Sequence, residues 1–165
     1  MNLRHRLLLS LLAGLSALPL PAAAVTYCVS DASALQTAIT SAANAPGDSV
    51  HDIRLRPGTY ALPSGLEFAP TNDLLDNKDF SITGGWNAGC SARTINPAAT
   101  VLNGAAASLD GNFHFGGNQE RIVVEGLRFI NFTQFKVDDE QCFGSPATCP
   151  DTTSVRVRYN EFRNG

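Results

Sequence analysis

Apolar and polar side chains alternate along several short stretches of this chain. The two clearest, residues 121–131 and 154–164, repeat one another at an offset of 33 residues. A period of two is typical of β-strands, and a strand that recurs at a fixed offset predicts strands stacked coil upon coil. The repeat predicts five stacked pairs: Ile122 with Val155, Val124 with Val157, Leu127 with Asn160, Phe129 with Phe162, and Asn131 with Asn164.

Earlier stretches predict further strands of the same stack. We expect strands at residues 25–29, 50–56, 59–62, 79–83, 100–104 and 111–115, and loops over residues 63–78 and 133–153. Intervals of 20 to 33 residues separate the successive inward positions Leu55, Ile82, Leu102, Ile122 and Val155. About twenty residues suffice for one coil of a parallel β-solenoid, so we treat these positions as equivalent in successive coils.

One helix is predicted between the first two strands. Ser30 or Asp31 can cap its N-terminus, and residues 44–48 contain the Pro-Gly pair that ends it. Four apolar residues recur at helical spacing: Leu35, Ala38, Ile39 and Ala42. The narrow apolar stripe indicates that the helix lies on another element. We expect it to cover the open end of the β core, although an ordinary surface helix shows the same pattern.

These elements predict an all-β parallel solenoid with an N-terminal capping helix. The fold alternative is a β-sandwich, whose antiparallel neighbours are commonly joined by two-residue Asn-Gly turns. Asn103-Gly104 is the one candidate for such a turn, and the segment after it is rich in alanine rather than strand-like. The scarcity of hairpin signals therefore favours the solenoid.

The composition fits an extracellular β-protein and narrows the choice of partners. The 165 residues suffice for one domain, and they are low in charge and rich in Gly, Asn, Ala and Thr. The formal charge is −3, and it becomes −5 without residues 1–24, which carry Arg4 and Arg6 and no acid. An acidic chain attracts neither nucleic acid nor an anionic membrane, so we expect neither as a partner.

Residues 1–24 have the three parts of a secretory signal peptide. Residues 4–6 are basic, residues 7–18 form an apolar run, and residues 22–24 supply an Ala-Ala-Ala cleavage site. The apolar run is shorter than the ~20 residues that a membrane span needs, which disfavours the alternative of an uncleaved anchor. We expect a mature domain of residues 25–165 that is secreted, periplasmic or on the cell surface, with no membrane contact after signal removal.

All four cysteines follow the predicted cleavage point: Cys28, Cys90, Cys142 and Cys149. An even number in an exported chain predicts two disulfides. Of the three possible pairings we favour Cys28 with Cys90 and Cys142 with Cys149, of which the second closes a short loop. The rival is a zinc site, but the chain has no Cys-x-x-Cys pair and its histidines His51 and His114 are isolated, so we expect both to be solvated or satisfied.

Four motifs occur in order along the chain. They are Ile-x-Leu-x-Pro-Gly-Thr-Tyr at residues 53–60, Phe-Ser-Ile-Thr-Gly-Gly-Trp-Asn-Ala-Gly-Cys at residues 80–90, Thr-Val-Leu-Asn-Gly at residues 100–104 and Val-Val-Glu-Gly-Leu at residues 123–127. In this order they resemble the N-terminal coils of exported bacterial right-handed parallel β-helix proteins of the pectate-lyase-like superfamily. The resemblance covers about residues 26–165.

This resemblance implies a right-handed coil of three sheets with inward stacks of aliphatic, aromatic and Asn side chains. It also implies that Asn131 and Asn164 belong to a ladder of hydrogen-bonded amides, although both fit ordinary turns equally well. The chain departs from the superfamily at its end, because members run for many coils and finish in a cap, whereas Gly165 follows closely on the inward Phe162. We therefore expect a domain that is incomplete at its C-terminal end, or one that covers this end by self-association.

Enzymes of this superfamily cut acidic polysaccharides, the lyases with Ca²⁺ and a basic residue and the hydrolases with clustered carboxylates. The one dense acidic cluster here is Asp138, Asp139 and Glu140, which supplies candidate Ca²⁺ ligands in the loop before Cys142. A solvated loop explains the same cluster. None of the superfamily's catalytic motifs matches this chain, so no catalytic residue is assigned and no cofactor other than Ca²⁺ is expected.

Arginines offer the other candidate site. The 33-residue register would bring Arg121, Arg128, Arg156 and Arg158 onto one outer face, with Arg158 near Glu125. Guanidinium groups bind carboxylates in a bidentate manner, so Arg128, Arg156 and Arg158 are candidate ligands for an acidic glycan. Plain solubility is the alternative explanation of this strip.

From these patterns and the resemblance, we expect an exported β-helix scaffold that is non-catalytic as it stands. It would bind or adhere to an acidic polysaccharide or a cell-surface glycan. The competing hypothesis is the N-terminal part of a polysaccharide lyase or glycoside hydrolase whose active site lies beyond Gly165. A third possibility is a truncated reading frame that does not fold stably alone.

Overall fold

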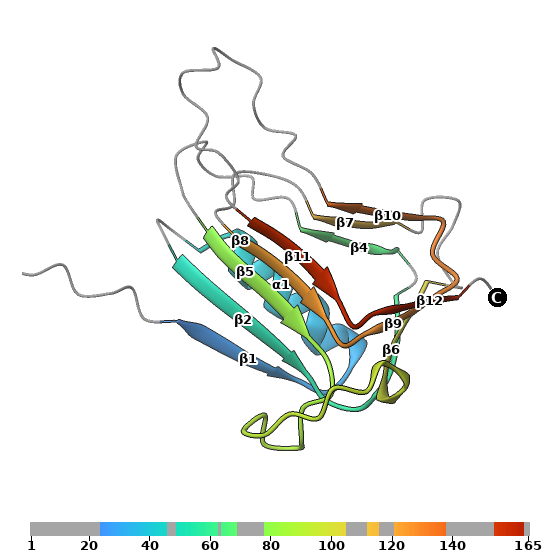
Figure 1. Ribbon diagram of the computed structural model, residues 1–165. Helices are drawn as coiled ribbons and strands as arrows, with labels where there is room; N and C mark the ends of the chain where they lie inside the picture. Colours follow the sequence, from blue (N-terminus) through green and yellow to red (C-terminus); the bar gives the residue numbers. More distant parts are fainter. Residues whose placement is uncertain are drawn as a thin grey trace, which may run out of the picture.

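The structure is a computed structural model that describes residues 24–45, 49–62, 64–68, 78–104, 112–115, 121–137 and 154–163. Within these ranges it consists mostly of short strands, with one α-helix, α1 (Ala32–Ala43), and one 3-10 turn, η2 (Pro97–Ala99). Figure 1 shows the strands in three groups, with α1 behind the largest of them in this view. The all-β expectation with one helix near the N-terminus is confirmed.

Among the described residues the strands form three sheets, and every neighbouring pair of strands is parallel. The first sheet has the order β1 (Val25–Val29), β2 (Ser49–Leu55), β5 (Lys78–Thr83), β8 (Arg121–Glu125) and β11 (Ser154–Arg158). The second has the order β3 (Gly58–Ala61), β6 (Thr100–Asn103), β9 (Arg128–Ile130) and β12 (Glu161–Arg163). The third consists of β4 (Leu66–Phe68), β7 (Asn112–Phe115) and β10 (Gln134–Val137).

The chain visits the three sheets in the same order each time. It runs through β2, β3 and β4, then β5, β6 and β7, then β8, β9 and β10, and finally β11 and β12. Each such circuit adds one strand beside the equivalent strand of the circuit before it. Parallel pairing throughout contradicts the β-sandwich alternative, whose sheets are antiparallel.

Three of the five stacked pairs expected from the 33-residue repeat are confirmed by the strand register. Val155 lies beside Ile122 and Val157 beside Val124 in the first sheet, and Phe162 lies beside Phe129 in the second. Stacking in register joins like residues into rows along the sheet, so the apolar face of one strand continues into the next. The row Ile53, Ile82, Val124 and Val157 is an example.

Residues 121–131 form two strands rather than one. Gly126, at φ 72°, turns the chain between β8 in the first sheet and β9 in the second, and Tyr159, at φ 54°, lies at the equivalent turn of the next circuit. The corners stack tightly, because a Cβ atom added to Gly84 would lie 2.4 Å from the carbonyl oxygen of Gly126. The alternation of apolar and polar residues thus continues across this corner, so the pattern alone does not reveal where one strand ends and the next begins.

Two other expectations about the strands are wrong. Ile82 lies in the first sheet beside Ile53, whereas Leu102 lies in the second beside Tyr60, so the 20-residue spacing does not join equivalent positions. The segments expected to be loops contain β4 and β10, which belong to the third sheet. These two strands are short, and neither carries a long alternating pattern.

Helix α1 lies where the pattern predicts it. The Asp31 side chain caps it by accepting a hydrogen bond of 2.9 Å from the backbone N–H of Ala34. Leu35 and Ile39 are buried in the same core as Val29 of β1. The helix packs against β1, β2 and β4, the N-terminal strands of the first and third sheets, which agrees with a covering role.

Aromatic and amide side chains stack between circuits. Phe129 and Phe162 are stacked with ring centroids 5.0 Å apart, and Phe113 meets Phe129 edge-on at 4.9 Å. The Asn131 amide donates a hydrogen bond of 2.9 Å to the Asn103 side-chain oxygen. An amide pair therefore forms at Asn131, but with the preceding circuit, and Asn164 lies outside the described residues.

Candidate functional site

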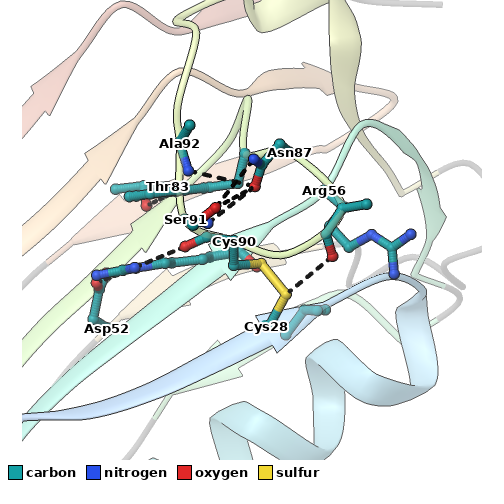
Figure 2. Close-up of a disulfide and its surroundings, with 12 residues drawn as sticks. Cys28, Asp52, Arg56, Thr83, Asn87, Cys90, Ser91 and Ala92 are labelled. Atoms are coloured by element: carbon teal, nitrogen blue, oxygen red, sulfur yellow. Dashed lines mark hydrogen bonds and ion pairs between the residues drawn. A yellow bond between two sulfur atoms is a disulfide. The ribbon is translucent and has the colours of Figure 1, made fainter.

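A disulfide fastens the loop that follows β5 to the edge of the first sheet. Cys28 of β1 bonds to Cys90, as predicted. Figure 2 shows the bond crossing from the β1 ribbon to the loop of Asn87, Ser91 and Ala92. On the loop side, Arg54 Nη1 donates a hydrogen bond of 2.8 Å to the Cys90 carbonyl oxygen. The pairing of Cys142 with Cys149 lies outside the described residues.

Trp86 is held at the base of this loop between two arginines. The Arg54 guanidinium lies 4.2 Å and the Arg93 guanidinium 6.0 Å from the indole ring centroid. The indole Nε1 donates a hydrogen bond of 2.8 Å to Thr83 Oγ1. Trp86 is partly buried, and the cation–π contacts together with the indole hydrogen bond tie the base of the loop to β2 and β5.

Glu125 is a buried carboxylate, 3% exposed, at the centre of an ion network. Arg93 Nη1 lies 3.0 Å from Glu125 Oε1, and Arg158 Nε lies 2.9 Å from Oε2. Arg93 also donates to the backbone carbonyl oxygens of Gly84 and Glu125, at 2.8 and 3.0 Å. Two guanidinium groups around one carboxylate satisfy both of its oxygens, which is what a buried charge requires.

Beside this network the outer face of the first sheet contains a groove of about 330 Å³. Its described lining comes from β2, β5, β8 and β11, together with Ala24 and Arg93. One row across its floor is Asp52, Ser81, Val123 and Arg156, which lie side by side on the four strands. Asp79 and Arg121 lie beside one another two residues earlier on β5 and β8.

The polar groups of the groove differ in how they are satisfied. Asp52 accepts a hydrogen bond of 2.6 Å from Arg54 Nε and one of 2.6 Å from Ser81 Oγ. Arg121 and Arg156 line the same groove, and neither side chain forms a hydrogen bond or ion pair with another described residue. These two guanidinium groups can therefore bind an anion without breaking an existing pair.

The arginines predicted to share one face are divided by the fold. Arg156 lies in the groove and Arg158 belongs to the Glu125 network, but Arg128 lies on β9 in the second sheet. There its Nε is 2.6 Å from Glu161 Oε2, and this hydrogen bond lowers the pKa of Glu161. The single Arg face is therefore wrong, because the corner at Gly126 turns β9 away from β8.

The acidic residues of the predicted Ca²⁺ site, Asp138, Asp139 and Glu140, lie outside the described residues. In the part of the chain that is described, no group of three or more His, Cys, Asp or Glu side chains could hold a metal ion. His51 is buried and lies 2.8 Å from Ser49 Oγ through Nε2, so it is satisfied, as expected.

Sequence reasoning missed Arg93, Trp86 and the acidic side of the groove. Arg93 stands in a turn-rich loop, where no periodic pattern indicates what its side chain reaches. Asp52 and Ser81 could have been predicted to face outward, since both alternate with inward residues. That they lie beside one another could not, because the offset that pairs β2 with β5 differs from the 33-residue offset of the clearest repeat.

No family model, no curated protein and no solved structure matches this chain. Among the described residues, no helix is both long and apolar enough to cross a membrane. Of the predicted signal peptide, residues 1–24, only Ala24 is described.

Proposed function

We propose that this protein is an exported scaffold that binds an acidic polysaccharide along the outer face of its first sheet. The observation that carries the proposal is the pair Arg121 and Arg156, which line one groove without a partner among the described residues. Guanidinium groups bind carboxylates through two parallel hydrogen bonds. Two of them on neighbouring strands match carboxylates spaced along a polymer.

The other side chains of the groove favour a sugar over a more highly charged polyanion. Asp52, Asp79 and Ser81 bring acceptors and a hydroxyl group to the same surface. Sugar hydroxyl groups can donate to these acceptors while the arginines hold the carboxylates.

The proposed fold is a right-handed parallel β-helix of the pectate-lyase-like superfamily. Support comes from the three parallel sheets visited in a constant order and from the amide pair Asn103 and Asn131. Right-handedness follows the strong preference of parallel crossover connections. The Cys28–Cys90 disulfide supports export, because disulfides persist in oxidising compartments.

Calorimetric titration with oligogalacturonate tests the binding proposal. The double variant Arg121→Gln with Arg156→Gln should bind about tenfold or more weakly, since each tenfold step corresponds to about 1.4 kcal/mol and each lost charge-assisted hydrogen bond contributes on that order. A neutral oligosaccharide of the same length should bind the wild-type protein less tightly than oligogalacturonate.

The matched control is the double variant Arg128→Gln with Arg163→Gln. It removes the same charge from the second sheet, where both arginines pair with Glu161. Its affinity should stay within about twofold of wild type, because exposed ion pairs outside the groove add little. Equal weakening by both double variants would show that net charge, not the groove, attracts the polymer.

Incubation with oligogalacturonate and Ca²⁺ separates this proposal from its enzymatic rival. A non-catalytic scaffold leaves the polymer intact, as judged by its chain length and by the ultraviolet absorbance of unsaturated products. Release of unsaturated or shortened sugars by the purified chain would favour a lyase or hydrolase instead.

A further inference from the structure

Two opposite charges lie side by side in the groove of the first sheet without forming an ion pair. Asp79 of β5 lies directly beside Arg121 of β8, and both side chains line the groove. Neighbouring positions on adjacent strands are about 4.8 Å apart, which is within reach of a guanidinium–carboxylate contact. Within the described part of the chain, however, neither side chain has a hydrogen bond or an ion pair. Both groups are therefore open to a ligand at the same place.

The other carboxylates of the groove are already satisfied. Asp52 accepts a hydrogen bond from Arg54 at one oxygen and from Ser81 at the other. Glu125 is bound through both of its oxygens in the ion network described above. Of the described carboxylates that line the groove, Asp79 is the one that accepts no hydrogen bond from a described residue. Its two oxygens keep their full capacity to accept hydrogen bonds.

Apolar side chains frame this pair of charges. Val50 of β2 lies beside Asp79 on the side away from Arg121, and Val123 follows Arg121 by two residues on β8. Both valines line the groove, whose volume of about 330 Å³ is at the lower end of the range for ligand sites, about 300–1,000 Å³. A ligand that fits it has to bring an anionic group, hydrogen-bond donors and an apolar surface within a short segment.

A sugar acid meets these three requirements. Its carboxylate can bind Arg121 while its hydroxyl groups donate to Asp79 and its ring C–H groups lie against the valines. We propose that Asp79 makes the groove specific for uronates among polycarboxylates, by accepting hydrogen bonds from their ring hydroxyl groups. This inference rests on the proposed binding of an acidic polysaccharide and assigns to it a residue that recognises the hydroxyl groups.

The specificity follows from the charge of Asp79. With a ligand that has hydroxyl groups, this carboxylate forms charge-assisted hydrogen bonds, which are about twice as strong as neutral ones. A polycarboxylate without donors leaves Asp79 unpaired beside the anionic group that Arg121 holds, which costs binding free energy. Asp79 should therefore strengthen the binding of one class of ligand and weaken that of the other, an effect that net charge alone does not produce.

Calorimetric titration of Asp79→Asn with two polymers of equal carboxylate number tests the inference. Oligogalacturonate should bind the variant about fivefold more weakly than wild type, because an amide oxygen is a weaker acceptor than a carboxylate. Oligoacrylate carries carboxylates and has no hydrogen-bond donor at neutral pH. It should bind the variant about twofold more tightly than wild type, because a nearby like charge is gone.

Glu161→Gln is the matched control, since it removes one negative charge from the second sheet. It should shift both affinities in the same direction and leave the preference between the polymers unchanged. Circular dichroism and thermal unfolding of Asp79→Asn should match wild type, because Asp79 has no described partner to lose. Export by a bacterial host that does not glycosylate asparagine is required, since the substitution creates the sequence Asn-Phe-Ser.

O-acetylated oligogalacturonate gives the same test from the ligand side. Acetylation removes hydroxyl donors, so it should weaken binding to the wild-type protein more than binding to Asp79→Asn. Equal losses on acetylation, or shifts of the same sign or no shift for the two polymers in Asp79→Asn, would overturn the role of Asp79 and leave the arginine site in place. No binding of oligogalacturonate by the wild-type protein would overturn the proposed function and this inference together.

Discussion

Phe129 and Phe162 hold equivalent places in neighbouring circuits, yet the first is 2% exposed and the second 54%. Phe129 has a circuit on both sides, with Leu102 beside it in β6 and Phe162 beside it in β12. Phe162 lies on the last strand of the second sheet. The two halves of the repeat therefore share a sequence pattern but differ in what covers them.

The contrast extends to the other end of the stack. There α1 covers the first strands, and Leu35 and Ile39 are buried against the core. In a parallel stack an apolar side chain is covered mainly by the equivalent side chains of the circuits on either side. Stability should therefore be concentrated in the inner circuits, and substitutions of equivalent residues should have unequal effects.

The largest expected difference is between Phe129→Ala and Phe162→Ala. Removing a buried phenylalanine ring typically costs about 3–5 kcal/mol, because it leaves a cavity as well as losing apolar burial. The half-exposed ring of Phe162 should cost well under half of that. Urea denaturation of both variants measures the difference, and equal losses would show that the last circuit is covered as fully as the one before it.

The disulfide should be the next largest contribution, and it acts on the N-terminal side. Replacing both Cys28 and Cys90 with serine frees a loop with a sequence separation of 62 residues, for which removal of a bridge typically costs about 2–4 kcal/mol. Thermal unfolding measures the loss. The double variant should also be insensitive to reductant at this bridge, whereas the wild-type protein should lose stability when reduced.

Glu125→Gln tests the ion network that joins Arg93 of the disulfide loop to Arg158 of the last circuit. The buried carboxylate neutralises Arg93 and Arg158, and its loss leaves two guanidinium groups facing a neutral amide. A fully buried pair would cost about 3–5 kcal/mol to break, but Arg158 is partly exposed, so we expect about 2 kcal/mol. Glu161→Gln, the comparable change on the last circuit, should alter stability less, because Glu161 and its partner Arg163 are more exposed than Glu125.

Much of this contrast can be predicted from the sequence, but only where the pattern is long. The 33-residue repeat correctly predicted that Val157 lies beside Val124. It could do so because residues 121–131 and 154–164 align without an insertion. Leu102 was misplaced because loops of unequal length separate the circuits, so equal spacing in sequence is not equal position in space. β4 escaped notice because three residues cannot display a period.

The candidate site was harder to predict for a related reason. Arg156 was named from its place in an alternating strand, and it does lie in the groove. Arg128 was named by the same logic and belongs elsewhere, since nothing in the alternation marks the corner at Gly126. Arg93 depends on a disulfide loop folding back over the sheet, which is a tertiary contact that no local pattern encodes.

The smallest expected effect concerns Tyr60, under the N-terminal end of the stack. The single proton of its buried hydroxyl group is shared between the carbonyl oxygens of Val29 and Arg56, which lie 3.0 and 2.9 Å from the hydroxyl oxygen. Tyr60→Phe should therefore cost about 1 kcal/mol at neutral pH, the usual net value of one hydrogen bond. Tyr159→Phe, an exposed tyrosine of the last circuit, should cost nothing measurable.

Ionisation of Tyr60 should also lower the stability of the protein at alkaline pH. Burial raises the pKa of Tyr60 from 10.0 to about 12. The folded state then holds a proton that the unfolded state loses first, so the contribution of Tyr60 is fully present below pH 10 and is lost as the pH rises towards 12. The free energy of unfolding of the wild-type protein should fall over this window, and Tyr60→Phe should flatten that fall. An unchanged slope in Tyr60→Phe would mean that other groups cause the alkaline loss and that Tyr60 ionises as freely as an exposed tyrosine.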